Sequence, residues 1–186
     1  MPPAIRTTKE EIVNAAVDIV RKDGASALNA RMIASVLNIS TQPVFSNFAS
    51  MSDLRLAVVE KADALCQAYM QQEVDRGEYP AYKANGMAYI RFAKQEKELF
   101  KLLYMRDRTG ESESQGAEIA QQMEEIVCNN TGLNGNDAKL FHLEMWAYVH
   151  GIATMFATGF LDLEWELVSK MLTDCYQGLR KHYGME

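Results

Sequence analysis

Apolar residues recur every three or four positions along most of the chain, which is the spacing of one face of an α-helix. The first such run follows Thr8 and contains Ile12, Ala15, Ala16, Ile19 and Val20. Thr8 and Glu11 have the spacing of a capping box, and Gly24 has the freedom to end the helix in a left-handed conformation. The pattern therefore predicts a helix between Thr8 and Gly24.

Two short helices are predicted after this first one. The first covers residues 31–37, with Asn29 as its N-cap, and the second covers residues 41–47, with Ser40 as its cap and Pro43 in its first turn. Asn38 begins the break between them, because asparagine tolerates the left-handed region. Two short helices joined by a three-residue turn and preceded by a longer helix form a helix-turn-helix unit.

The remainder of the chain also has helical periodicity, and no strand pattern of useful length interrupts it. We expect a long helix from Ser50 or Ser52 to Gly77, and further helices over residues 82–98, 99–106, 116–130, 137–158 and 162–182. A polar loop over residues 107–115 and a breaker over residues 131–136 separate some of them. The predicted fold is all-α with about nine helices: a three-helix helix-turn-helix domain over residues 1–50 and a second helical domain over residues 51–186.

Composition and charge limit the function. The 186 residues are 48% hydrophobic, enough for a substantial core, and the formal net charge is −6. Residues 1–60 are neutral overall, so the remainder carries the negative charge, and DNA binding at the N-terminus is permitted without bulk positive charge. No apolar run reaches membrane-spanning length and no apolar signal core begins the chain, which predicts a cytoplasmic protein without membrane contact. The scattered cysteines are expected to be free thiols; they are Cys66, Cys128 and Cys175.

The second short helix has the chemistry of a DNA reader. A major groove accepts one α-helix, whose N-terminal residues then reach base edges. Four polar residues are predicted to point outward, namely Thr41, Gln42, Ser46 and Asn47, while Val44, Phe45 and Phe48 are predicted to anchor the helix. Glutamine and asparagine can pair bidentately with adenine, and serine and threonine reach bases or phosphates.

Residues 8–57 resemble the N-terminal part of the TetR family of bacterial transcriptional regulators. The matching positions are Ala15, Ala16, Gly24, Ala34, Leu37, Ile39, Ser40, Phe45, Phe48, Asp53 and Leu54. Trp146, His150 and Gly151 resemble the Trp-His-Gly pattern of one C-terminal class in that family. The resemblance implies an Ω-shaped homodimer joined through its last two helices, with a ligand pocket in each body. Ligand binding would swing the long linking helix until the two recognition helices no longer fit half-sites about 34–36 Å apart.

The chain departs from the family pattern at three positions. Many members have lysine where Met51 stands and tyrosine where Phe45 stands, both used for phosphate contacts, and glycine where Asn38 stands. Phosphate contacts would then depend on Arg6, Arg31 and backbone N–H groups at helix starts. The DNA-binding candidates are accordingly Arg6, Arg31, Ser40, Thr41, Gln42, Ser46 and Asn47.

Methionine and aromatic residues are frequent in the middle of the chain, with 11 methionines in all. An apolar effector pocket is one interpretation, and its candidates are Met87, Tyr104, Met123, Trp146 and His150. The other interpretation is an ordinary core, since periodic apolar residues usually pack, and a lone histidine such as His150 is more often a core residue than a ligand contact. No metal site, no cofactor and no catalytic constellation is readable, so an enzyme is not expected.

The sequence therefore predicts a regulator that binds a double-stranded DNA operator, as a repressor released by an apolar small-molecule effector. The uncharged recognition helix and the net charge of −6 leave one alternative open, an all-helical small-molecule carrier or sensor without DNA binding.

Overall fold

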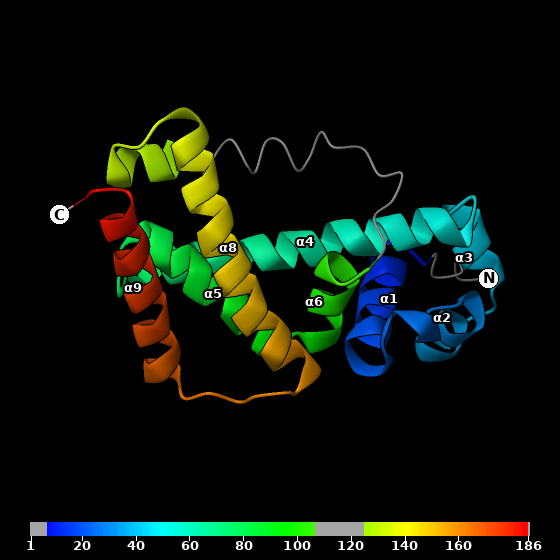
Figure 1. Cartoon of the computed structure of the whole chain (residues 1–186). Coiled ribbons are helices and arrows are strands. Elements are labelled where there is room, and N and C mark those ends of the chain that lie inside the picture. Colours follow the sequence, from blue (N-terminus) through cyan, green and yellow to red (C-terminus); the bar gives the residue numbers. More distant parts are fainter. Residues whose placement is uncertain (1–6, 107–124, 186) are drawn as a thin grey trace. The chain divides into compact units, whose positions relative to one another are not determined.

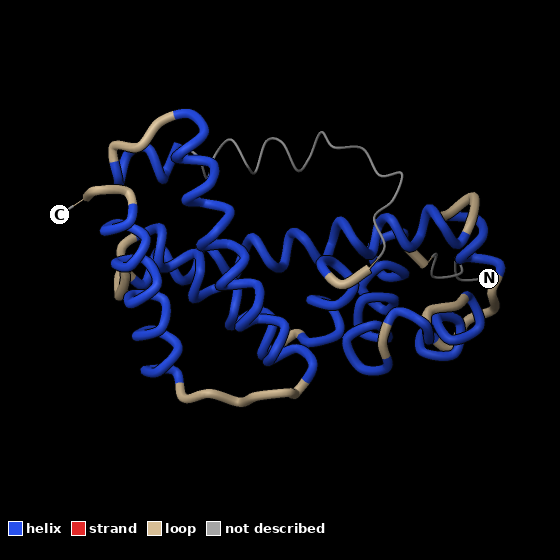
Figure 2. The backbone as a smooth tube through the Cα atoms, viewed as in Figure 1, coloured by secondary structure: helices blue, strands red, loops and turns tan. Residues whose placement is uncertain are grey.

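The structure is a computed structural model that describes residues 7–106 and 125–185, and within these residues all regular elements are helices (Figure 2). They are α1 (Lys9–Asp23), a 3-10 turn (Ala25–Ala27), α2 (Ala30–Leu37), α3 (Gln42–Asn47), α4 (Met51–Arg76), α5 (Ala81–Gln95), α6 (Lys97–Tyr104), α8 (Gly135–Thr158) and α9 (Trp165–His182). A further helical segment covers residues 125–131. The predicted all-α class is confirmed, and the predicted loop over residues 107–115 lies outside the described residues.

The chain forms two compact units. The N-terminal unit comprises residues 1–68 and 96–106, and the C-terminal unit comprises residues 69–95 and 107–186. The N-terminal unit thus extends beyond residue 50 into α4 and also takes in α6. The boundary at residue 50 between a DNA-binding domain and a ligand-binding and dimerisation domain stays a prediction.

Helix α1 is the centre of the N-terminal unit and contacts α2, α3 and α6 (Figure 1). The predicted capping box starts it: the Glu11 N–H donates to Thr8 Oγ1 over 3.2 Å, and the Thr8 N–H donates to Glu11 Oε2 over 2.7 Å. Its apolar face is buried as the periodicity predicted, through Ile12, Ala15, Ala16, Val17, Ile19 and Val20. This helix supports both members of the helix-turn-helix.

The turn between α2 and α3 follows the sequence closely. The Met32 N–H donates to Asn29 Oδ1 over 3.0 Å, so the predicted N-cap of α2 is confirmed. Asn38 ends α2 with φ 53° and ψ 47°, the left-handed conformation expected of it. Helix α3 begins one residue later than predicted, at Gln42, because Thr41 is the N-cap; the predicted capping role of Ser40 is wrong.

In the C-terminal unit α5 packs along α8, and both contact α9. Gly86 permits the close approach: a Cβ atom added there would lie 3.1 Å from Leu172 Cδ2 and 3.4 Å from Val149 Cγ2. The predicted breaker is confirmed, since Gly132 and Gly135 have positive φ and the chain between residues 131 and 135 is not helical. No described helix is both long and apolar enough to cross a bilayer.

Candidate functional site

Helix α3 has one buried and one exposed face, and the exposed face carries the candidate DNA readers. Val44 and Phe48, four residues apart, are buried against the rest of the N-terminal unit, whereas Gln42 and Ser46 are exposed. The prediction that Phe45 anchors the helix is wrong, because its side chain is 55% exposed. Position 45 lies three residues after Gln42, which places it on the exposed face.

Two of the predicted readers already make hydrogen bonds within the protein. Ser46 Oγ donates to the Gln42 carbonyl over 3.0 Å. Asn47 is half-buried, and its Nδ2 donates to the carbonyls of Pro43 (2.8 Å) and Thr7 (3.5 Å). Contact with DNA would therefore require Asn47 to exchange these bonds, whereas Gln42 is free to turn outward.

The remaining candidates lie around the ends of α2 and α3. Arg31 is exposed in the first turn of α2, Ser40 is exposed in the turn, and Thr41 is half-buried at the start of α3. Arg6 lies outside the described residues. Of the two arginines predicted to contact phosphates, the structure therefore describes Arg31.

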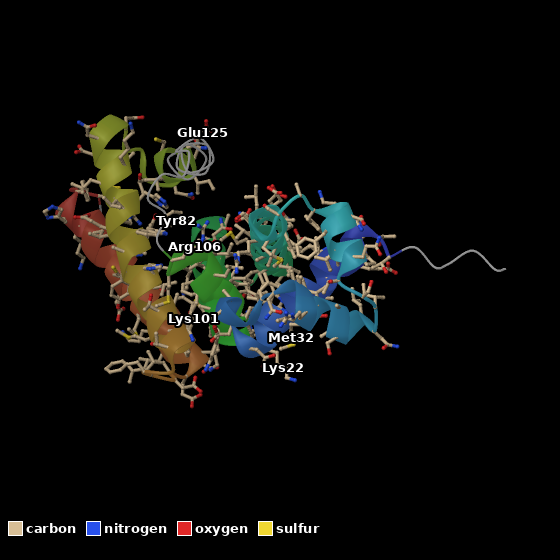
Figure 3. All side chains as sticks on the ribbon, turned by 90° about the vertical axis from the view of Figure 1, so that its right-hand side faces the viewer. Lys22, Met32, Tyr82, Lys101, Arg106 and Glu125 are labelled. Atoms are coloured by element: carbon tan, nitrogen blue, oxygen red, sulfur yellow. The ribbon has the colours of Figure 1, made fainter. Side chains whose placement is uncertain are left out.

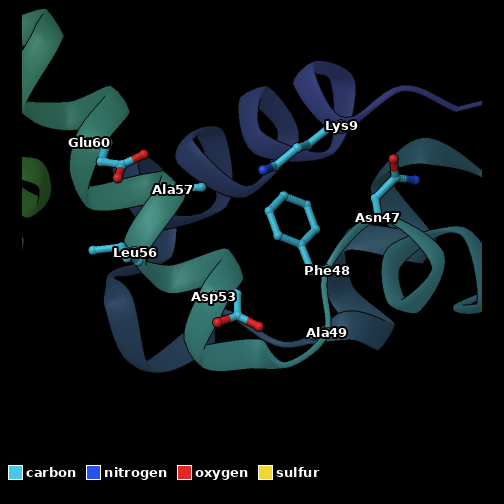
Figure 4. A pocket seen from close by; sticks show the side chains of 8 residues that line it. All are labelled: Lys9, Asn47, Phe48, Ala49, Asp53, Leu56, Ala57 and Glu60. Atoms are coloured by element: carbon cyan, nitrogen blue, oxygen red, sulfur yellow. The ribbon is translucent and has the colours of Figure 1, made fainter.

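A shallow hollow of about 330 Å³ lies beside α3 in the N-terminal unit. Its lining residues come from α1, the end of α3 and the start of α4: Lys9, Asn47, Phe48, Ala49, Asp53, Leu56, Ala57 and Glu60. The Lys9 ammonium lies 5.1 Å from the centre of the Phe48 ring (Figure 4), a cation–π arrangement. Because Asp53 and Glu60 also line this hollow, we assign no phosphate site to it.

In the C-terminal unit two tyrosines of α5 meet two histidines of α8. Tyr82 Oη lies 3.1 Å from His142 Nδ1, and Tyr89 Oη lies 2.9 Å from His150 Nδ1. Burial lowers the pKa of both imidazoles, which favours their neutral form. Neither tyrosine was predicted as a site residue from the sequence, although their spacing of seven residues places them on one face of a helix.

Three of the predicted effector residues belong to this same unit. Trp146 stacks on His150, with ring centroids 4.9 Å apart and an angle of 16° between the planes. Met87 is fully buried in α5. Tyr104 belongs to the N-terminal unit instead, where its hydroxyl lies 3.4 Å from Cys66 Sγ, and Met123 lies outside the described residues. Burial raises the pKa of the Cys66 thiol to about 11, so this cysteine is not a reactive thiolate.

The face of α8 that points away from the core carries apolar side chains. Leu140, Leu143 and Trp146 are exposed there, although each is large and hydrophobic. Gly151 marks no close approach between described helices, since no described atom lies within 4 Å of the position that a Cβ atom at Gly151 would take. Within residues 7–106 and 125–185, this side of α8 is therefore not covered at Gly151.

A buried carboxylate that the sequence does not predict joins three elements of the C-terminal unit. Glu73, 1% exposed, accepts from Arg91 Nε over 3.1 Å and from Arg91 Nη2 over 3.2 Å. Arg76 Nη1 donates to the same carboxylate over 3.0 Å. The Arg91 guanidinium also lies 4.4 Å from the centre of the Trp165 ring. These contacts join the end of α4 to α5 and α9.

The family model described as "Tetracyclin repressor-like, C-terminal domain" matches residues 82–174. The chain belongs to the TetR family. The match covers α5, α6 and α8 and most of α9, and the helix-turn-helix of α2 and α3 precedes it. The family predicted from the N-terminal residues is thus confirmed by an independent part of the chain. Within residues 7–106 and 125–185 no three His, Cys, Asp or Glu side chains are grouped as metal ligands would be.

Solved structures share this TetR-family fold over nearly the whole chain. A protein of unknown function from Rhodococcus sp. RHA1 is 23% identical with a TM-score of 0.75, and the alignment covers 98% of each chain. A TetR-like transcriptional regulator from Rhodococcus sp. RHA1 is 16% identical with a TM-score of 0.70 and covers 99% of each chain. The multidrug binding protein EbrR, complexed with imidazole, is 16% identical with a TM-score of 0.62 and covers 89% of this chain and 88% of its own. No curated protein matches the chain.

Proposed function

We propose that this TetR-family chain is a DNA-binding repressor that an apolar small molecule releases from its operator. The observation that carries the proposal is the surface of α3. A short helix is held from behind by Val44 and Phe48 and presents Gln42 and Ser46 outward, beside the exposed Arg31 of α2. A helix held in this way can enter a major groove.

The proposed contacts divide into base readers and phosphate contacts. Gln42 would pair with adenine, with Thr41, Ser46 and Asn47 as further base contacts. Phosphates would be bound by Arg6, Arg31 and Ser40 and by backbone N–H groups. Because so few of these groups are cations, we expect affinity to depend weakly on salt.

The proposed effector site is in the C-terminal unit, at the stacked Trp146 and His150. Aromatic planes and a neutral imidazole suit an apolar or aromatic molecule, and the buried Met87 can adapt its shape to such a ligand. Met123 and Tyr104, the remaining sequence candidates, are not assigned to this site, because Tyr104 belongs to the N-terminal unit and Met123 lies outside the described residues. The relative EbrR is described as a multidrug binding protein, which agrees with an effector of this kind.

We propose a homodimer formed by α8 and α9 of two copies. The uncovered side of α8, with Leu140 and Leu143, supports this, and Leu167 of α9 is also exposed. A monomer with so many large apolar side chains exposed on neighbouring elements has a surface suited to burial by a second copy. The Trp146 and His150 pair would then lie beside the dimer interface.

Binding to the DNA upstream of the chain's own coding region tests the proposal, with fluorescence anisotropy as the readout. We expect the wild type to select specific sites and Gln42→Ala to weaken them by about 1–3 kcal/mol. Gln72→Ala, which changes an exposed glutamine of α4, is the matched control and should bind normally. Absence of specific binding by the wild type at low salt would overturn the proposal. The slope of log K against log[salt] reports the number of phosphate contacts. A slope as steep as about six contacts per half-site require would show that the proposed set of phosphate contacts is wrong.

A further inference from the structure

Phe45 is an unexplained feature of the proposed DNA-reading surface. Its side chain is 55% exposed on α3, three residues after Gln42 and directly before Ser46, both of which are also exposed. The sequence assigned it to the core, but Val44 and Phe48 fill that position. An aromatic side chain left in water on a binding face is suited to cover an apolar group of the partner.

A phosphate oxygen is not a suitable partner for this ring, because phenylalanine has no hydrogen-bond donor. The major groove offers one apolar group at base edges, the 5-methyl of thymine, and phenylalanine is among the side chains that contact it. Gln42 and Phe45 are three residues apart, or about 4.5 Å along the helix axis. Successive nucleotides of one DNA strand are about 3.4 Å apart along the duplex, so the two side chains reach neighbouring base pairs.

We propose that Phe45 is a specificity-determining residue that packs against the 5-methyl group of a thymine next to the base pair contacted by Gln42. The proposal rests on the DNA-binding function proposed above. It adds that the base pair next to the one contacted by Gln42 is recognised through an apolar contact. The recognised sequence therefore contains an A·T pair that Gln42 does not itself contact.

Deoxyuridine tests the contact, because it differs from thymidine only by the missing methyl group. The full chain first selects its preferred sites from a randomised duplex pool, and each thymine of the half-site is then replaced in turn by deoxyuridine. For the wild type we expect one replacement to weaken binding about fourfold, the factor that burial of one methyl-sized apolar group gives. In Phe45→Ala the same replacement should have no effect, because the ring that covers the methyl group is absent.

Two further variants complete the test. Leu56→Ala removes an apolar side chain that is 59% exposed on α4, and it should keep the full deoxyuridine effect. Phe45→Leu keeps an apolar side chain and should keep part of it. An equal deoxyuridine effect in the wild type and in Phe45→Ala would overturn the proposal, and so would a wild type that no replacement weakens. If no sequence is selected at all, the DNA-binding function itself fails, and the Phe45 contact fails with it.

Discussion

The two units of the molecule are stabilised in different ways. In the described part of the N-terminal unit no charged side chain is buried; the capping hydrogen bonds at Thr8 and Asn29 lie near the surface, and the Cys66 thiol lies 3.4 Å from the Tyr104 hydroxyl in the interior. The C-terminal unit has an equally apolar core but also contains the buried Glu73, its arginine partners and two tyrosine–histidine bonds. The two units are therefore both helical but differ in the polar groups buried among their helices.

The difference agrees with the separate tasks proposed for the units. The N-terminal unit has to hold α3 in one position while its reading groups stay in water, and apolar packing is sufficient for that. A buried charge such as Glu73 costs free energy unless it is paired, so Arg91 of α5 must stay in place beside the end of α4. Polar pairs of this kind favour one arrangement of the end of α4 relative to α5.

Truncation of Phe48 should have the largest effect on stability. Phe48→Ala removes a ring that is 4% exposed and supports α3, and we expect a loss of about 3–5 kcal/mol in the free energy of unfolding. Phe45→Ala, on the exposed face of the same helix, should change it by less than about 0.5 kcal/mol. Urea unfolding followed by circular dichroism measures both. Equal losses in the two variants would contradict the division of α3 into a buried and an exposed face.

Neutralising Glu73 should be the next largest effect. Glu73→Gln leaves the Arg91 guanidinium without its charged partner, and breaking a buried pair in this way costs about 3 kcal/mol. Glu60→Gln changes an exposed carboxylate of the same helix and is the matched control. The double variant Glu73→Leu/Arg91→Met should recover much of the loss, because it removes both charges. A double variant as unstable as Glu73→Gln would show that packing, and not the unpaired charge, sets the cost.

Local signals made much of the N-terminal unit predictable from the sequence. The capping box at Thr8, the N-cap at Asn29 and the left-handed Asn38 each depend on residues within a few positions, so the boundaries of α1 and α2 follow from short motifs. The face of Phe45 was predicted wrongly because α3 is too short for periodicity to fix its register. With only six residues, aromatic character alone suggested burial.

The polar contacts of the C-terminal unit could not be predicted in the same way. Tyr89 and His150 are 61 positions apart, and Glu73 and Arg91 are 18 positions apart, so the pairs exist only once the helices have packed. A helix-surface glutamate and a buried one have the same local sequence signal. Trp146 and His150 were singled out through the resemblance to the Trp-His-Gly pattern, and their stacking follows from a local spacing of four residues on one helix.

Removal of a helix N-cap should lower the free energy of unfolding by a smaller amount, and the amount should differ between the two units. Asn29→Ala removes the acceptor for the Met32 N–H and should destabilise the protein by about 1 kcal/mol. Asn134 is the N-cap residue of α8 but makes no capping hydrogen bond through its side chain, so Asn134→Ala should cost less than about 0.5 kcal/mol. Thermal and urea unfolding of the two variants measure the difference. Equal costs would mean that the capping bond at Asn29 adds nothing to stability.

Acidification should have the smallest effect, and it should act through the C-terminal unit. Burial lowers the pKa of His142 and His150 in the folded protein below the ordinary value of 6.5, so the unfolded chain binds protons first as the pH falls. The free energy of unfolding therefore decreases as the pH drops below about 6.5 and levels off once the folded histidines are also protonated. Urea midpoints measured between about pH 8 and pH 5 test this. His150→Gln should flatten the profile, whereas His182→Gln, which changes an exposed histidine of α9, should leave it unchanged. A His150→Gln profile as steep as that of the wild type would exclude this imidazole as a source of the pH dependence.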